Sequence, residues 1–160
     1  MYLSEALTKL KNLKSKAKRI DVYISASVVY YEDAEPEYVF LEECANRDEI
    51  QAEILNLKSK IIKTNANTLV NYNNQSISLT KVILLNAQAR IQLAFLSGLQ
   101  ALEKSGHSYV SRTREEIKKV YAVGYDKTNI KISIDAVEQK KEVLESIMAN
   151  ANANTPLVED

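Results

Sequence analysis

Turn-forming residues are scarce in this sequence, and their scarcity limits the folds that the chain can adopt. Its 160 residues include three Gly and two Pro, whereas average usage gives about ten and about eight. Sheet sandwiches and barrels reverse the chain every few residues and need turn residues at short intervals. The sequence therefore predicts long helices, within one domain large enough to bury a core.

Apolar residues recur at intervals of three and four along most of the chain, which is the spacing of one helix face. Ser4 is expected to be the N-cap of the first helix. The end of that helix stays open between residues 22 and 31, because the run "VYISASVVYY" is β-branched and aromatic and favours extended backbone. The expected helices span about residues 4–25, 37–68, 78–104 and 130–150.

Three further segments are expected to be non-helical. "NYNNQS" (71–76) is expected to form a loop, because Asn tolerates left-handed backbone. Residues 109–126 fit either a short helix or a strand, and "VYAVGY" before a turn favours an extended segment. The polar, low-complexity residues 151–160 are expected to form a flexible tail. The fold class is then mainly all-α, with antiparallel helical hairpins that resemble a coiled-coil bundle and a short extended segment.

The third helix has an unusually broad apolar face. Ile83, Leu84, Ile91 and Phe95 widen the inner stripe that begins with Val82. A surface this broad packs on more than one neighbour. Long helices with narrow apolar seams also leave apolar surface exposed unless they meet other helices. We therefore expect a homo-oligomer.

The charge balance argues against a nucleic-acid partner. Lys plus Arg and Asp plus Glu both total 21, so the formal net charge is zero, and no global field attracts an anionic polymer. The local run Lys9–Arg19 is basic and is either a solvated helix face or a contact for an anionic partner. We expect no signal sequence and no membrane span, since no apolar stretch is long enough. Together with a single cysteine, this favours a soluble, cytoplasmic protein.

Residues able to perform catalysis are few. His107 is the only histidine and Cys44 the only cysteine, and neither has partners at metal-ligand or triad spacing. The adjacent carboxylate pairs, such as Glu42 with Glu43, point about 100° apart on a helix and do not form a dyad. Phosphate-binding and dinucleotide-binding motifs are missing from the sequence. We expect no catalytic, cofactor-binding or metal-binding residues.

Two polar clusters remain as candidate sites. The first lies near the end of the second helix, where polar residues continue an apolar stripe; they form either a polar layer that fixes helix register, a frayed helix end, or a ligand site. The second follows the third helix and is either an ion-pair network, a docking strip between subunits or an anion site. The candidates are Thr64, Asn65, Asn67 and Thr68 in the first cluster, and Ser111, Arg112, Arg114, Glu116 and Lys118 in the second.

Several short motifs occur in the order that one bacterial protein family shows. They are "LSEALTKLKNLKSKAKRI", "EDAEPE", "IIKTNANT", "SISLTKVILLNAQAR", "SRTREEIK" and "NANTPL". In this set the chain resembles the DIP1984 family, whose members are uncharacterised and in some cases named septicolysin. Lys63 stands where the family pattern has Asn. The resemblance implies a helical, oligomeric protein and no established activity.

Three functions are compatible with the sequence. The first is a non-catalytic, self-associating helical scaffold or interaction protein. The second is a ligand-binding or enzymatic site built on the Thr64, Asn65 and Thr68 cluster together with Arg112 and Arg114. The third is a membrane-active, septicolysin-like protein that uses the Lys-rich first helix; the absence of a pore-forming segment argues against it.

Overall fold

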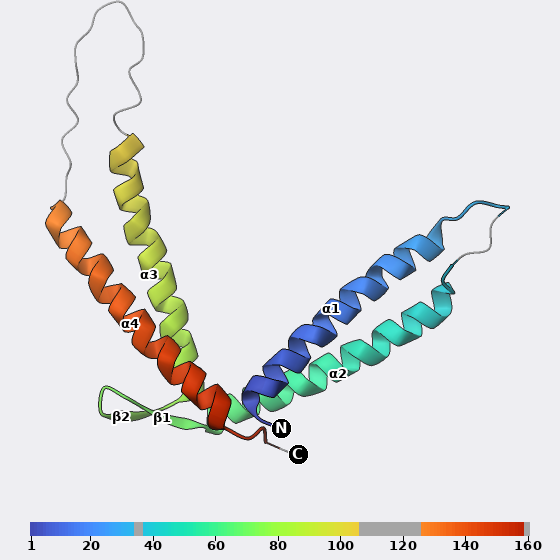
Figure 1. The fold of residues 1–160 in the computed structure, drawn as a ribbon, viewed down its shortest axis with the longest axis horizontal. Coiled ribbons are helices and arrows are strands. Elements are labelled where there is room, and N and C mark those ends of the chain that lie inside the picture. The colour runs from blue at the N-terminus through green and yellow to red at the C-terminus, as the bar shows by residue number, and fades with distance from the viewer. Residues whose placement is uncertain (34–36, 106–125, 159–160) are drawn as a thin grey trace, which may run out of the picture. The chain divides into compact units, whose positions relative to one another are not determined.

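The fold is mainly α, as the sequence predicts, with four long helices and one small hairpin in the described residues (Figure 1). The computed structural model describes residues 1–33, 37–105 and 126–158. The elements in chain order are α1 (Leu3–Val28), α2 (Phe40–Asn67), β1 (Leu69–Tyr72), β2 (Gln75–Ser78), α3 (Leu79–Ser105) and α4 (Lys127–Asn154).

The helix boundaries differ from the expected ones by a few residues. Tyr2, and not Ser4, is the N-cap of α1. Helix α1 runs to Val28, which places its end within the β-branched run whose conformation the sequence left open. Helix α2 begins at Phe40, three residues later than expected. Helix α4 extends beyond its expected range at both ends. The segment expected to be extended, 109–126, lies outside the described residues except for its last position.

The loop expected at 71–76 is wrong, because this stretch is the tight end of a β-hairpin. Strands β1 and β2 pair antiparallel, with Val70 opposite Ile77. Asn73 and Asn74 lie at the turn with φ of 50° and 60°. A two-residue turn with both φ values positive matches the right-handed twist of the strands, and Asn adopts it readily.

The flexible tail expected from residue 151 is also wrong for the residues that the structure describes. Helix α4 continues to Asn154. The backbone N–H of Leu3 then donates to the carbonyl of Thr155 at 3.0 Å, and that of Leu157 donates to the carbonyl of Met1 at 2.8 Å. Tyr2 and Pro156 form an isolated antiparallel bridge. We call residues 155–158 the C-terminal strap, since they are fixed against the start of α1.

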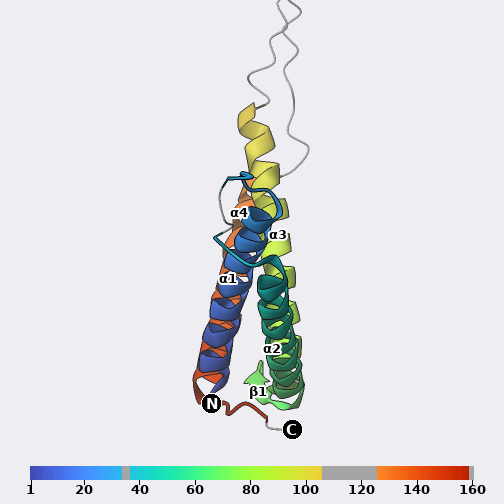
Figure 2. The ribbon, with the colours of Figure 1, turned by 90° about the vertical axis from the view of Figure 1, so that its right-hand side faces the viewer.

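The chain divides into two compact units. The first contains residues 1–80 and 149–160. In it α1 and α2 run antiparallel and side by side (Figures 1 and 2). Their shared core contains Ala17, Ile20, Ile50 and Ile54, with half-buried Leu10, Leu13, Tyr23 and Ile24 packed against it.

The second unit contains residues 81–148, with most of α3 and α4. Val82 and Ala89 of α3 are buried, as are Val137 and Leu144 of α4. On each helix the two positions are seven residues apart, which places them on one face, as in helices that pack on one another. An ion pair between Arg90 of α3 and Glu145 of α4, with Nη2 and Oε1 2.7 Å apart, joins the two helices at their exposed side.

Candidate functional site at the end of helix α2

A buried hydroxyl ends the apolar stripe of α2. The stripe consists of Ile50, Ile54, Leu57 and Ile61, and the next position on the same face is Thr64. Thr64 is 1% exposed and is therefore as buried as the core aliphatic residues. A hydroxyl at such a position needs hydrogen-bond partners, because burial removes it from water.

The Thr64 hydroxyl has two partners. It donates to the carbonyl of Lys60, one turn earlier in α2, at 2.7 Å. It accepts a hydrogen bond from the backbone N–H of Val158, in the C-terminal strap, at 3.0 Å. A residue near the middle of the chain thus fixes the strap 94 positions later.

The other three candidates of this cluster have different surroundings. Thr68 closes α2: its backbone N–H and its hydroxyl both reach the Thr64 carbonyl, at 2.9 and 2.8 Å. Asn67 is exposed. Asn65 is half-buried, and its side-chain oxygen is buried without a hydrogen-bond partner among the described residues. The structure brings Thr64 and Thr68 into one hydrogen-bonded group and leaves Asn67 outside it.

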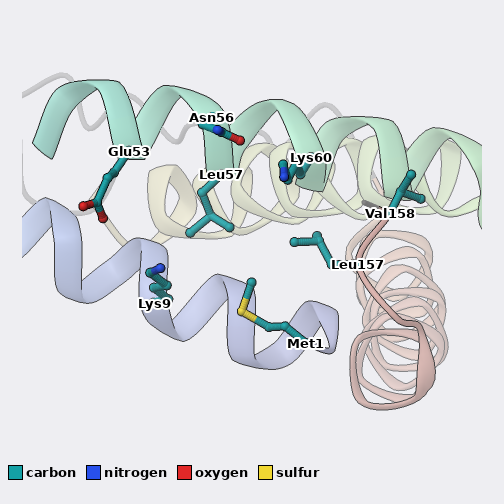
Figure 3. Close-up of a pocket in the computed structure, with 8 residues that line it drawn as sticks. All are labelled: Met1, Lys9, Glu53, Asn56, Leu57, Lys60, Leu157 and Val158. Atoms are coloured by element: carbon teal, nitrogen blue, oxygen red, sulfur yellow. The ribbon is translucent and has the colours of Figure 1, made fainter. Parts of the chain in front are cut away.

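A groove of about 330 Å³ lies between α1, α2 and the strap (Figure 3). Met1, just before α1, and Lys9 of α1 reach into it from one side, and Leu57 and Glu53 reach into it from α2. The full lining is Met1, Lys9, Glu53, Asn56, Leu57, Lys60, Leu157 and Val158.

The chemistry of this groove is that of a binding surface. Its apolar part comes from Leu57 and the strap, and its charged groups are two ammonium groups and the carboxylate of Glu53. The lining contains no thiol, imidazole or hydroxyl. An apolar surface flanked by groups of both charges is suited to binding a small molecule.

The second predicted cluster lies outside the described residues. Ser111, Arg112, Arg114, Glu116 and Lys118 all belong to the segment 106–125. His107 also belongs to that segment. Cys44 is described, and it is half-buried as a free thiol. In the described residues no group of three or more His, Cys, Asp or Glu side chains is arranged to hold a metal ion.

A polar cluster in the second unit was missed by the sequence analysis. Asn86 is 4% exposed, on the inner face of α3 between Val82 and Ala89. Its side-chain oxygen has no hydrogen-bond partner among the described residues. Glu145 of α4 accepts from Arg90, which lowers the pKa of its carboxyl, and a hydrogen bond from Asn86 acts in the same direction. The signal was present in the sequence, because position 86 has the spacing of the inner stripe.

Three other contacts of charged or aromatic groups lie in the first unit. Arg47 of α2 and Asp21 of α1 form an ion pair with Nε and Oδ1 2.6 Å apart, which raises the pKa of Arg47. Tyr23 stacks on Tyr38 with ring centroids 4.3 Å apart. Tyr38 also donates to Glu37, and this carboxylate raises the pKa of the Tyr38 hydroxyl. The ion pair is exposed, whereas the two stacked tyrosines are half-buried.

Against the expectation that no apolar stretch is long enough, one helix among the described residues is long and apolar enough to cross a membrane. The stretch is Leu79–Gln100 of α3, and 17% of the residues in its most apolar part are buried. Arg90, near its middle, pairs with Glu145. The stretch is thus an apolar helix whose surface is mostly uncovered.

A solved structure with a similar fold is known. No family model matches the chain, and no curated protein matches it. The crystal structure of a functionally unknown conserved protein from Corynebacterium diphtheriae superimposes with a TM-score of 0.86 over 99% of each chain, at 19% sequence identity. The two chains share a fold. At this identity the likeness extends to the arrangement of helices and hairpin and not to an activity.

Proposed function

We propose that this protein is a non-catalytic, self-associating helical protein whose uncovered helix faces pair with other copies of the chain. The observation that supports this most directly is the set of large apolar side chains exposed on α3. Leu84, Ile91 and Phe95 are 64%, 72% and 64% exposed. Positions 84 and 91 are one heptad apart and 95 follows one turn later, so the three side chains lie along one side of the helix.

Exposed apolar side chains at helical spacing also occur on two other helices. Leu55 and Ile62 of α2 are 71% and 67% exposed, and Ile132 and Val143 of α4 are 59% and 50% exposed. Scattered apolar residues are normal on a protein surface, whereas contiguous apolar stripes mark interaction sites. Covering one such side chain fully contributes about 1.5–3 kcal/mol. The stripes therefore favour association.

The experiment is a measurement of mass in solution. Size-exclusion chromatography with light scattering at micromolar concentration is expected to give a multiple of the chain mass of 18.0 kDa. A mass of one chain across the concentration range would refute the proposal. Ile91→Glu, on the exposed side of α3, is expected to lower the mass if α3 is covered by protein.

Membrane association is a second candidate, because α3 has the length and composition of a span. The lysine-rich face of α1, which includes Lys11, Lys14 and Lys18, could add attraction to an anionic surface. Self-association is favoured, since Arg90 and Asn86 place polar groups in the middle of α3 and Arg90 is engaged with α4. Flotation with vesicles of anionic lipid at low salt separates the two: recovery with the vesicles supports the membrane, and recovery in the soluble fraction supports protein assembly.

Membership of the DIP1984 family is also a proposal. It is supported by the ordered motifs in the sequence and by the fold that the chain shares with a conserved Corynebacterium diphtheriae protein of unknown function.

The ligand-site alternative is supported by the groove beside the strap and by the side-chain oxygen of Asn65, which has no hydrogen-bond partner among the described residues. Native mass spectrometry of the purified protein, compared with an Asn65→Leu variant, tests that alternative.

A further inference from the structure

Helix α2 has a second stripe of small and apolar residues on the side away from its core. We call it the outer seam: Leu41, Ala45, Asp48, Ala52, Leu55, Ser59, Ile62 and Ala66. Its members alternate at intervals of four and three, which is the spacing of a coiled-coil seam. All eight are exposed. Because each residue turns the helix by about 100°, the outer seam lies nearly opposite the inner stripe of Ile50, Ile54 and Leu57.

The outer seam alternates small and large residues in a regular way. Every seventh residue from Ala45 is small, and every seventh residue from Leu41 is large or, at Asp48, polar. Small residues allow a second helix to approach closely, and the large residues of that helix then fill the space above them. Such a surface is complementary to a second copy of itself in the opposite direction.

The charge distribution of α2 also favours an antiparallel copy. Residues 40–53 contain five acidic residues and one Arg, whereas residues 54–67 contain three Lys and no acidic residue. The same distribution suits the dipole of a single helix. In an antiparallel pair, however, the acidic half of each helix lies against the basic half of the other; in a parallel pair, like charges meet along the whole length.

We propose that α2 pairs with α2 of a second copy, antiparallel and about a twofold axis between Glu53 and Ile54. This proposal rests on the self-association proposed above and names its surface. The axis lies at the midpoint of Phe40–Asn67, so all 28 residues of each helix overlap. Each copy's seam residues then face those of the other copy in the pairs Ala52 with Leu55, Ala45 with Ile62, Ala66 with Leu41, and Ser59 with Asp48.

The register follows from the polar residues. With the axis at the midpoint, the carboxylate of Asp48 faces the hydroxyl of Ser59, which can donate to it. Moving one helix by seven residues in one direction places Asp48 against Ala66 within the seam. Beside the seam, Lys58 then lies against Lys58 of the second copy. Moving it in the other direction places Glu49 against Glu49. Like charges at flanking positions are unfavourable, so both neighbouring registers are disfavoured.

Crosslinking with two matched cysteine variants tests the pairing, with Cys44→Ser in both. In the proposed dimer the two copies of position 52 are almost level, whereas the two copies of position 45 are about 25 Å apart along the axis, at 1.5 Å per residue. A short bis-maleimide is expected to link Ala52→Cys into a species of twice the chain mass and to leave Ala45→Cys unlinked. Equal linking of both variants would indicate a parallel pair and overturn the proposal.

A charged substitution in the seam separates this proposal from self-association in general. Leu55→Glu, added to the Ala52→Cys variant, is expected to abolish the crosslink, and its far-UV circular dichroism should match the parent, because Leu55 is 71% exposed. Val22→Glu on α1, at a site 64% exposed, is the matched control and should leave the crosslink intact. If neither cysteine variant links although light scattering shows an assembly, the α2 pairing is wrong and self-association stands. A monomeric wild-type chain refutes both.

Discussion

The hydroxyl of Thr64 makes two hydrogen bonds at a position where an aliphatic side chain would fill the same space. Its donation to Lys60 is local to α2, whereas its acceptance from Val158 links α2 to the C-terminal strap. The sequence indicated a polar residue in an apolar stripe, but it gave no sign of the partner, because the strap is distant in the chain. A buried hydroxyl is stable only when protein groups replace the hydrogen bonds that water would make, and Lys60 and Val158 do so here.

Replacing Thr64 with Val therefore removes the acceptor while preserving shape. Thr64→Val is expected to lower the free energy of unfolding by about 1–2 kcal/mol, because the N–H of Val158 loses its partner. Chemical denaturation measures the change. Thr64→Ser keeps the hydroxyl and serves as the control for the hydrogen bond. In a chain shortened to residues 1–154, the Val substitution should cost less, and an unchanged cost would show that the strap contact contributes nothing.

The ion pair between Arg90 and Glu145 makes the stability of the second unit depend on pH. Arg90 lowers the pKa of the Glu145 carboxyl. A lowered folded-state pKa means that the pair stabilises the fold above the usual carboxyl pKa and that this stabilisation is lost as pH falls through the lowered value. Arg90→Met should raise the pKa of Glu145 toward its usual value, as measured by carboxyl NMR titration. Arg47→Met, which breaks the ion pair in the other unit, should leave the Glu145 titration unchanged.

At the scale of the element, the sequence predicts helices well and short strands poorly. Helices α1 to α4 were expected because each has several turns of apolar periodicity, and a few misplaced residues do not change the pattern. The hairpin was missed because β1 and β2 have four residues each, too few for alternation to be distinguished from chance. The turn residues were recognised: Asn73 and Asn74 were expected to adopt left-handed backbone, and both have positive φ.

The helix ends and faces were harder to predict than the helices. Helix α2 has two seams of equal spacing, and periodicity alone does not say which one faces α1: Leu41, on the outer seam, is 76% exposed. The C-terminal strap was taken as part of a tail because the residues before it, 149–154, are polar and low in complexity, yet backbone hydrogen bonds to Met1 and Leu3 fix it. Backbone pairing of this kind leaves no mark in the side-chain pattern.

At the scale of the whole molecule, the four helices are long and their outer faces are incompletely covered. All four helices expose large apolar side chains, among them Val22 of α1, Leu55 of α2, Ile91 of α3 and Ile132 of α4. On α2, α3 and α4 such side chains recur on one side of the helix, whereas α1 also has a lysine-rich face that includes Lys11, Lys14 and Lys18. A further layer of protein would stabilise the apolar faces of α2, α3 and α4.

If that further layer is another copy of the chain, thermal stability must depend on protein concentration. Mass action stabilises a folded dimer against unfolded chains by about 1.4 kcal/mol for each tenfold increase in concentration. Shared between two chains of this length, that corresponds to a rise in Tm of about 2 °C per tenfold. Scanning calorimetry between micromolar and hundred-micromolar protein measures it. Leu55→Glu should flatten the dependence and Val22→Glu should not; a wild-type Tm that is constant over the range would show that the chain folds without a partner.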